Sequence, residues 1–263
     1  MRSGVTRRDV VIAAAGLAPA WPWAAADPFD ADPFKSHQWP ELKKEFLGPQ
    51  ARIRFDDRVR VLGPAFAEDA MNVPITVSAL ALPGVERIIV VVDRNPIRQV
   101  LEFVPVAALP VLSFRFKLEQ ASPVRALALT RDGTWQVGGT WVDSAGGGCT
   151  VPGAARKNET WPQTLGNVNG RLFSAVPGTS SATRLRLRVM HPMDTGLVAG
   201  IPAFYVKRIS VLDRQGGELA RLATFEPVSE NPLFSFDFES PPQRPLRIVG
   251  SDNNGNRIDS VLP

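Results

Sequence analysis

The stretch Thr183-Arg184-Leu185-Arg186-Leu187-Arg188-Val189-Met190 alternates aliphatic side chains with arginines. A period of two is typical of a β-strand that buries one face and exposes the other to solvent. The run Ser113-Phe114-Arg115-Phe116-Lys117-Leu118 has the same alternation earlier in the chain. These two stretches predict strands of antiparallel sheets, and the row of arginines predicts a solvated face.

Similar runs, separated by turn residues, fill both halves of the chain, and they favour an all-β protein. In the first half we expect strands at Val59–Leu62, Val73–Leu80, Val85–Val92, Leu101–Pro105, Ser113–Leu118, Val124–Leu129 and Trp135–Val142. In the second half we expect them at Thr183–Met190, Phe204–Leu212, Leu219–Phe225, Leu233–Phe238, Leu246–Val249 and Arg257–Val261. A short helix is expected over residues 40–47, where apolar side chains recur at near-helical spacing.

The spacing of these elements predicts two Ig-like antiparallel β-sandwich domains joined by a linker. The first domain spans residues 27–150 and ends in a glycine run, and the second spans residues 182–263. Between them, residues 151–181 are interrupted repeatedly by Pro, Gly and Asn, which predicts a linker.

Residues 1–26 have the features of an export signal and are excluded from the expected fold. Thr6-Arg7-Arg8 precedes a short apolar run, and Ala24-Ala25-Ala26 offers a cleavage site. The paired arginines are similar to a twin-arginine signal, which predicts a periplasmic protein. Removal of these residues lowers the formal net charge from +4 to +2, so we expect no nucleic-acid partner. No later segment is apolar enough to predict a membrane span.

Cys149 is the single cysteine of the chain, and it directly follows Gly146-Gly147-Gly148. Glycines have the freest backbones of all residues, so the run predicts a flexible arm that holds the thiol away from the core. The competing interpretation is an inert, buried cysteine, which is the common state of a lone thiol. In an oxidising compartment an exposed thiol would also be open to pairing between two chains.

Several kinds of catalytic and metal site are not predicted. The two histidines, His37 and His191, cannot form a local zinc site with one cysteine, and we expect no metal. The sequence contains no P-loop, no dinucleotide-binding fingerprint and no Gly-x-Ser-x-Gly motif. A pairing of Cys149 with His191 as nucleophile and base is disfavoured, because they lie in different expected domains. The sequence therefore predicts a protein that is not an enzyme and has no cofactor.

Taken together, these features resemble a fusion of SoxY and SoxZ, the sulfur-carrier pair of thiosulfate oxidation, and in particular the SoxYZ-like carriers that accompany quinoprotein dehydrogenases. The SoxY-like segment is Val142–Cys149. The SoxZ-like segments are His191–Gly196, Ile201–Tyr205, Asn231–Phe236 and Ser251–Gly255.

The resemblance implies that Cys149 carries a covalent sulfur adduct and presents it to periplasmic redox enzymes. These partners would be sulfur-oxidation enzymes, or a quinoprotein dehydrogenase or cytochrome c. The chain departs from the carriers in one respect, because their cysteine lies in a free C-terminal Gly-Gly-Cys-Gly-Gly arm. Here Thr150-Val151-Pro152-Gly153 and a second domain follow, so the arm is tethered at both ends.

Two alternatives to a carrier remain open from the sequence. One is a non-catalytic Ig-like module that docks a periplasmic dehydrogenase or cytochrome, with Cys149 incidental. The other is a homodimer linked by a disulfide through Cys149. For the segment His191–Gly196, a strand end and turn is favoured over a direct chemical role, because Pro and Gly punctuate it.

Overall fold

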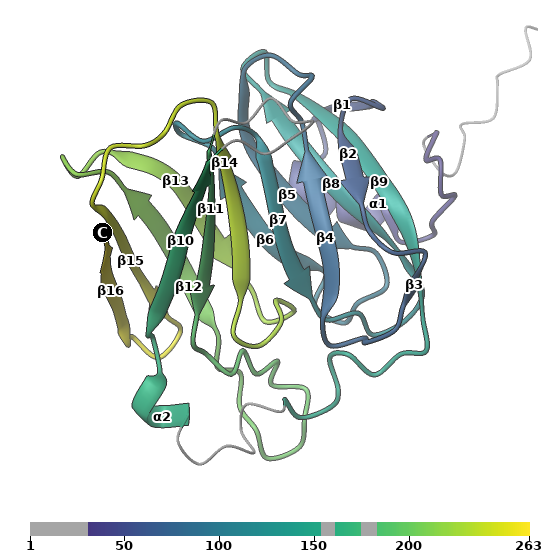
Figure 1. Cartoon of the computed structure of the whole chain (residues 1–263). Helices are drawn as coiled ribbons and strands as arrows, with labels where there is room; N and C mark the ends of the chain where they lie inside the picture. The colour runs from purple at the N-terminus through teal and green to yellow at the C-terminus, as the bar shows by residue number, and fades with distance from the viewer. Residues whose placement is uncertain (1–30, 154–160, 175–182) are drawn as a thin grey trace, which may run out of the picture.

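Two β-sheets packed face to face form the protein, as Figure 1 shows for the computed structural model. The structure describes residues 31–153, 161–174 and 183–263. The expected export signal, residues 1–26, lies outside the described residues. Within these residues no helix has the length and apolar character needed to cross a bilayer.

The larger sheet has ten strands and the smaller has six. The larger consists of β1 (Arg52–Phe55), β3 (Phe66–Ala67), β5 (Val85–Val92), β6 (Gln99–Val104), β8 (Ser122–Thr130), β9 (Thr134–Ser144), β12 (Val206–Leu212), β13 (Glu218–Thr224), β15 (Leu246–Asp252) and β16 (Arg257–Leu262). The smaller consists of β2 (Arg60–Leu62), β4 (Val73–Ser78), β7 (Val111–Phe116), β10 (Val168–Ser174), β11 (Thr183–Val189) and β14 (Leu233–Phe238).

The all-β prediction is confirmed, and each expected strand run overlaps a strand of the structure. Two strand pairings depart from the expected antiparallel pattern, because β1 and β3 both pair in parallel with β9. Both are short strands at the edge of the sheet, and the sequence analysis did not anticipate them. The remaining pairings are antiparallel, as alternating, half-buried strands favour.

Both sheets continue without a break from the first half of the chain into the second. β6 pairs with β13 in the larger sheet, and β7 pairs with β14 in the smaller one. Apolar side chains from both halves fill one shared core, in which the rings of Phe103 and Phe236 lie 6.0 Å apart between centroids. The two sandwich halves are therefore held together by backbone hydrogen bonds and by a common core.

Part of the expected linker is ordered secondary structure, so that prediction is wrong for residues 161–174. These residues form α2 (Trp161–Thr164) and β10, and β10 pairs with β11 along its whole length. Because Asn169-Gly170 is typical of a turn, the sequence analysis did not predict this strand. Gly170 fits there because a Cβ at this position would lie 2.3 Å from a methyl carbon of Leu262. The domain boundaries themselves stay predictions.

The N-terminal segment covers the outer face of the larger sheet. The expected helix over 40–47 is present as α1 (Trp39–Leu42), which continues as a π-helical turn (Lys43–Leu47). Trp39 and Leu42 are fully buried and pack with Ile89, Val91, Leu127, Trp135 and Val137 in a second apolar cluster. The larger sheet is thus buried on both faces beneath this segment. No described helix lies over the outer face of the smaller sheet (Figure 1).

Candidate functional site

A short platform after β7 forms the base of the site around Cys149. Leu118 donates its backbone N–H to the carbonyl of Ala70 at 2.8 Å. Asn95 holds the platform from the other side: its amide donates to Lys117 O at 2.8 Å, and its oxygen accepts from the Glu119 N–H at 2.9 Å. These hydrogen bonds hold the segment Lys117–Glu119 in place and leave the carbonyls of Leu118 and Glu119 able to accept hydrogen bonds from another chain segment.

The glycine arm lies on this platform. Gly147 and Gly148 donate their backbone N–H groups to the carbonyls of Glu119 and Leu118, at 3.1 and 3.2 Å. A Cβ on Gly148 would lie 2.2 Å from the carbonyl oxygen of Ala70 and 2.6 Å from that of Leu118. Gly148 is therefore required by close packing against backbone, and the arm is docked along this segment.

Cys149 is fully buried at the end of the arm, and the expectation of an exposed thiol on a mobile tether is wrong for this structure. Its N–H donates to a carboxylate oxygen of Glu119 at 2.8 Å, and its Sγ lies 3.6 Å from Lys117 O. Among the described residues, neither apolar cluster includes Cys149. The buried sulfur therefore lies outside both apolar clusters.

The cover comes from the second half of the chain, from the loop between β11 and β12, residues 190–205, which we call the covering loop. Thr195 donates its hydroxyl to the carbonyl of Cys149 at 2.6 Å. The buried ammonium of Lys117 donates to Met193 O. Asp194 and Phe204 close the base of the loop through a pair of backbone hydrogen bonds. Figure 1 shows the chain after β9 running along the lower edge of the sandwich towards this loop.

Burial sets the ionisation of the two central groups. It raises the pKa of the Cys149 thiol to about 12, and the neighbouring Glu119 carboxylate adds to the effect. Lys117 opposes this shift but does not overcome it. Burial also lowers the pKa of Lys117 to about 8, although nearby acidic groups favour its charged form. At neutral pH the docked Cys149 is a neutral thiol, and a neutral thiol is neither a good nucleophile nor a metal ligand.

His191 lies at the start of the covering loop and is buried. Its Nδ1 accepts the N–H of Met193 at 3.0 Å, so the neutral ring carries its proton on Nε2. Nε2 lies 3.6 Å from a carboxylate oxygen of Asp252, and the ring packs 4.4 Å from that of Phe204 between centroids. The contact with Asp252 links the covering loop to β15, the other two lie within the loop, and none of the three is with Cys149. The disfavoured nucleophile–base pairing of Cys149 and His191 thus gains no support.

The burial of His191 predicts acid sensitivity. Burial lowers the pKa of His191 to about 4, against the attraction of Asp252, from an ordinary value of 6.5. The unfolded chain therefore takes up a proton as the pH falls below 6.5, and the folded protein does so only near pH 4. This linkage is expected to remove up to about 3 kcal/mol of the free energy of unfolding between these two pH values.

Urea unfolding at intervals from pH 7 to pH 4 measures this loss. The variant His191→Gln cannot take up the proton, so its free energy of unfolding should depend less steeply on pH than that of the wild type. His37→Gln, at an exposed position, is the matched control and should follow the wild-type slope. Parallel curves for wild type and His191→Gln would contradict the prediction.

The residues that hold Cys149 were not found by sequence analysis. The alternation in Ser113–Leu118 places Lys117 on the same outward face as the exposed Arg115. Its buried ammonium donates to Met193 O of the covering loop, which comes from the other half of the chain. Glu119 belonged to no motif, and Thr195 lay in the SoxZ-like segment His191–Gly196, for which a strand end and turn was favoured over a chemical role. Among the described residues, no group of three or more His, Cys, Asp or Glu side chains is placed to hold a metal ion.

Comparison with known proteins separates the chain into two parts. The family model "Sulfur oxidation protein SoxY" matches residues 43–149 and therefore ends at Cys149. The family model "Sulphur oxidation protein SoxZ" matches residues 175–262. No curated protein matches the chain.

Among solved structures, the sulfur carrier protein SoxY from Chlorobium limicola f thiosulfatophilum is similar to part of the chain. The match has 19% sequence identity and a TM-score of 0.36, and it covers 41% of this chain and 96% of that one. The two matching families, SoxY and SoxZ, are non-catalytic carrier and adaptor proteins of sulfur oxidation, in agreement with the expectation that the chain is not an enzyme. The chain therefore contains a domain of the SoxY family followed by a domain of the SoxZ family, joined in tandem as a SoxY–SoxZ fusion.

Proposed function

We propose that the protein is an exported, periplasmic carrier that holds a sulfur-containing group covalently on Cys149 and delivers it to partner enzymes. The observation that carries this proposal is the place of Cys149. It lies at the end of the SoxY match, on an arm held by hydrogen bonds at the sandwich edge. Contacts of this kind can open without unfolding the core, because loop segments open locally at lower cost than the whole protein unfolds.

In this proposal the structure is the closed, unloaded state. Cys149 has no exposed surface, and backbone surrounds Gly148 on two sides. A sulfur adduct on Cys149 therefore needs the arm to leave the platform. Once released, the thiol loses the burial that raises its pKa and regains a reactive thiolate fraction. The closed state protects an empty carrier, and the open state loads and unloads it.

Loading follows the chemistry of thiol–disulfide exchange. The Cys149 thiolate attacks a sulfur of a donor persulfide or disulfide. A new S–S bond forms on Cys149, the S–S bond of the donor breaks, and the remaining donor sulfur departs as a thiolate. The exchange needs no external oxidant and no protein cofactor. We propose sulfur-oxidation enzymes as partners, with a quinoprotein dehydrogenase or cytochrome c as the finer alternative that the sequence resemblance supports.

Intact-mass spectrometry of the protein purified from its native periplasm tests the carrier proposal. A fraction of the protein should carry added mass that a reducing agent removes, and the adduct should map to Cys149. Cys149→Ser should lack the adduct and abolish the sulfur-dependent function. If Cys149 is a plain thiol under all growth conditions, the proposal fails.

The burial of Cys149 favours a second candidate, a non-catalytic docking module for a periplasmic dehydrogenase or cytochrome. In that case the thiol fills space and takes no part in chemistry. Cys149→Ser distinguishes the two, because the docking module would keep its activity and the carrier would lose it. A disulfide dimer through Cys149 stays a prediction, readable on a non-reducing gel, and it too would need the arm to open.

A further inference from the structure

The outer face of the six-stranded sheet carries a strong excess of positive charge. Strand alternation and cross-strand register place six arginines on this face: Arg60, Arg115, Arg171, Arg184, Arg186 and Arg188. The corresponding strand positions hold one carboxylate, Asp237, which binds Arg184 through two hydrogen bonds of 2.6 and 2.8 Å. Within the described residues, no carboxylate pairs with the other five arginines. We call this surface the arginine face.

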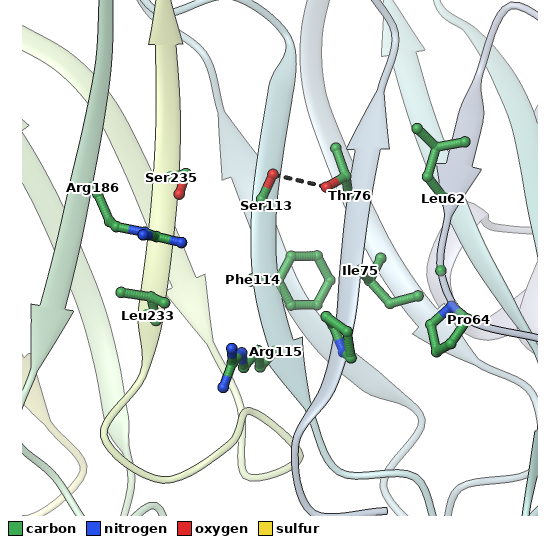
Figure 2. A pocket seen from close by; sticks show the side chains of 12 residues that line it. Leu62, Pro64, Ile75, Thr76, Ser113, Phe114, Arg115, Arg186, Leu233 and Ser235 are labelled. Atoms are coloured by element: carbon green, nitrogen blue, oxygen red, sulfur yellow. Dashed lines mark hydrogen bonds between the residues drawn. The ribbon is translucent and has the colours of Figure 1, made fainter. Parts of the chain in front are cut away.

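A groove crosses the arginine face at the seam between the two halves of the chain. It has a volume of about 340 Å³, and its apolar lining comes from Leu62, Pro64, Pro74, Ile75, Phe114 and Leu233. Figure 2 shows Arg186 reaching from β11 across β14, with Arg115 below it on β7. The hydroxyls of Thr76 and Ser113 bond to each other at 2.8 Å above the apolar floor. The groove therefore combines an apolar floor with two guanidinium groups at its rim.

The groove depends on the tandem arrangement. β4 and β7 come from the first half, whereas β11 and β14 come from the second, and the rim arginines come one from each half. Cross-strand pairing aligns Arg186, Ser235, Ser113, Thr76 and Leu62 in one row across five strands. Neither half alone presents this row, so the surface is a property of the joined chain.

We propose that the arginine face is a docking surface for an acidic protein that inserts one apolar side chain into the groove. Arginine is suited to this role, because its planar guanidinium binds carboxylates through two hydrogen bonds and is weakly hydrated. Four of the arginines without carboxylate partners lie together on β10, β11 and β7 and repel one another. An acidic surface relieves that repulsion and steers the encounter. The apolar floor favours a protein over a nucleic acid or an acidic polysaccharide, because an aliphatic or aromatic side chain can fill it.

This surface is separate from the Cys149 site, and its test does not depend on the carrier proposal. The probe is a short fluorescent peptide of aspartate and glutamate residues around one central phenylalanine. Its binding to the full chain is measured by fluorescence anisotropy at low ionic strength and at about 0.15 M salt. Binding should be strongest at low ionic strength, and replacing the phenylalanine of the peptide by serine should weaken it several-fold.

Matched charge reversals locate the binding. The double variant Arg115→Glu with Arg186→Glu should lower the affinity for the peptide at least tenfold. Both side chains are exposed to solvent, so the fold should tolerate the change. Lys207→Glu with Arg208→Glu reverses as much charge at exposed positions of β12 in the other sheet and should change affinity less than about twofold. The variant Cys149→Ser should bind the peptide as tightly as the wild type does. The peptide test therefore does not depend on whether the carrier proposal holds.

Three results would overturn the proposal. The first is absence of peptide binding at low ionic strength. The second is an equal loss of affinity in the Lys207/Arg208 control, which would show that net charge alone governs binding. The third is tighter binding of heparin or a duplex DNA oligonucleotide than of the peptide, with the same dependence on Arg115 and Arg186. That outcome would make the arginine face a general polyanion surface.

Discussion

Replacing Arg125 by leucine is expected to lower the free energy of unfolding by about 3–5 kcal/mol. The Arg125 side chain has no exposed surface and binds two buried carboxylates. Its nitrogens lie 2.6 and 2.8 Å from the oxygens of Asp32, and 2.7 and 2.8 Å from those of Asp93. The guanidinium also lies 4.9 Å from the ring centroid of Phe34 and 4.7 Å from that of Trp39. Leucine would leave two negative charges buried and unpaired.

Equilibrium urea unfolding measures this loss, and the exposed pair Arg247–Asp259 supplies the control. Arg247→Leu breaks an ion pair of 2.5 Å whose partners are both about half exposed to solvent, so its effect on the free energy of unfolding should be much smaller than that of Arg125→Leu. Adding Asp32→Asn to Arg125→Leu removes one of the two buried, unpaired carboxylate charges. The double variant should therefore recover part of the lost free energy of unfolding. If Arg125→Leu costs no more than Arg247→Leu, the buried triad does not fasten the N-terminal segment to the sheet.

Gly148→Ala is expected to release the cysteine arm and to accelerate the alkylation of Cys149 by iodoacetamide at least a hundredfold. In the wild type the raised pKa of about 12, compared with an ordinary 9.0, lowers the thiolate fraction at neutral pH by roughly a thousandfold. Burial restricts the reagent further. An alanine Cβ at position 148 would meet backbone atoms of Ala70 and Leu118, and these cannot move aside without breaking the platform.

Gly147→Ala is the matched control for this experiment. Gly147 also has a neighbour, Val151, but at an ordinary 3.6 Å, so an alanine there meets only the strain of its positive φ of 82°. That strain costs about 1–2 kcal/mol and should raise the alkylation rate by roughly tenfold. Rates are compared with that of the urea-unfolded chain, and circular dichroism checks that each variant is folded. Wild-type alkylation as fast as in the unfolded chain would show that the docked arm does not persist in solution.

The sequence analysis anticipated the regular parts of the fold well. Alternation within Thr183–Met190 defines β11, and the same period locates β7. The mostly apolar runs of β5 and β8 were recognised instead from the turn residues that follow them. A strand that buries one face alternates apolar and polar residues in its own sequence, so it can be predicted without knowing which strands pair with it. β1, β3 and β10 were missed because they are short or contain a turn-like Asn-Gly, and their pairing with β9 or β11 is what orders them.

The state of Cys149 shows where local analysis failed. Three glycines are equally compatible with a mobile tether and with a segment packed tightly against other backbone, because a missing Cβ permits both. The choice between them depends on Ala70, on the platform Lys117–Glu119 and on Thr195, which lie far from the glycines in sequence. The burial of Lys117 has the same origin, since its strand alone places it on the solvent side.

The amino-acid sequence by itself determined most of the β-strands, the tandem of two families and the single thiol, because each of these depends on residues that are neighbours in the chain. Only the tertiary structure decided that the two halves share both sheets, that Cys149 is covered, and that arginines from separate strands form one surface. These properties depend on contacts between segments distant in the chain. Cross-strand register and the path of the covering loop set those contacts, and neither is encoded locally.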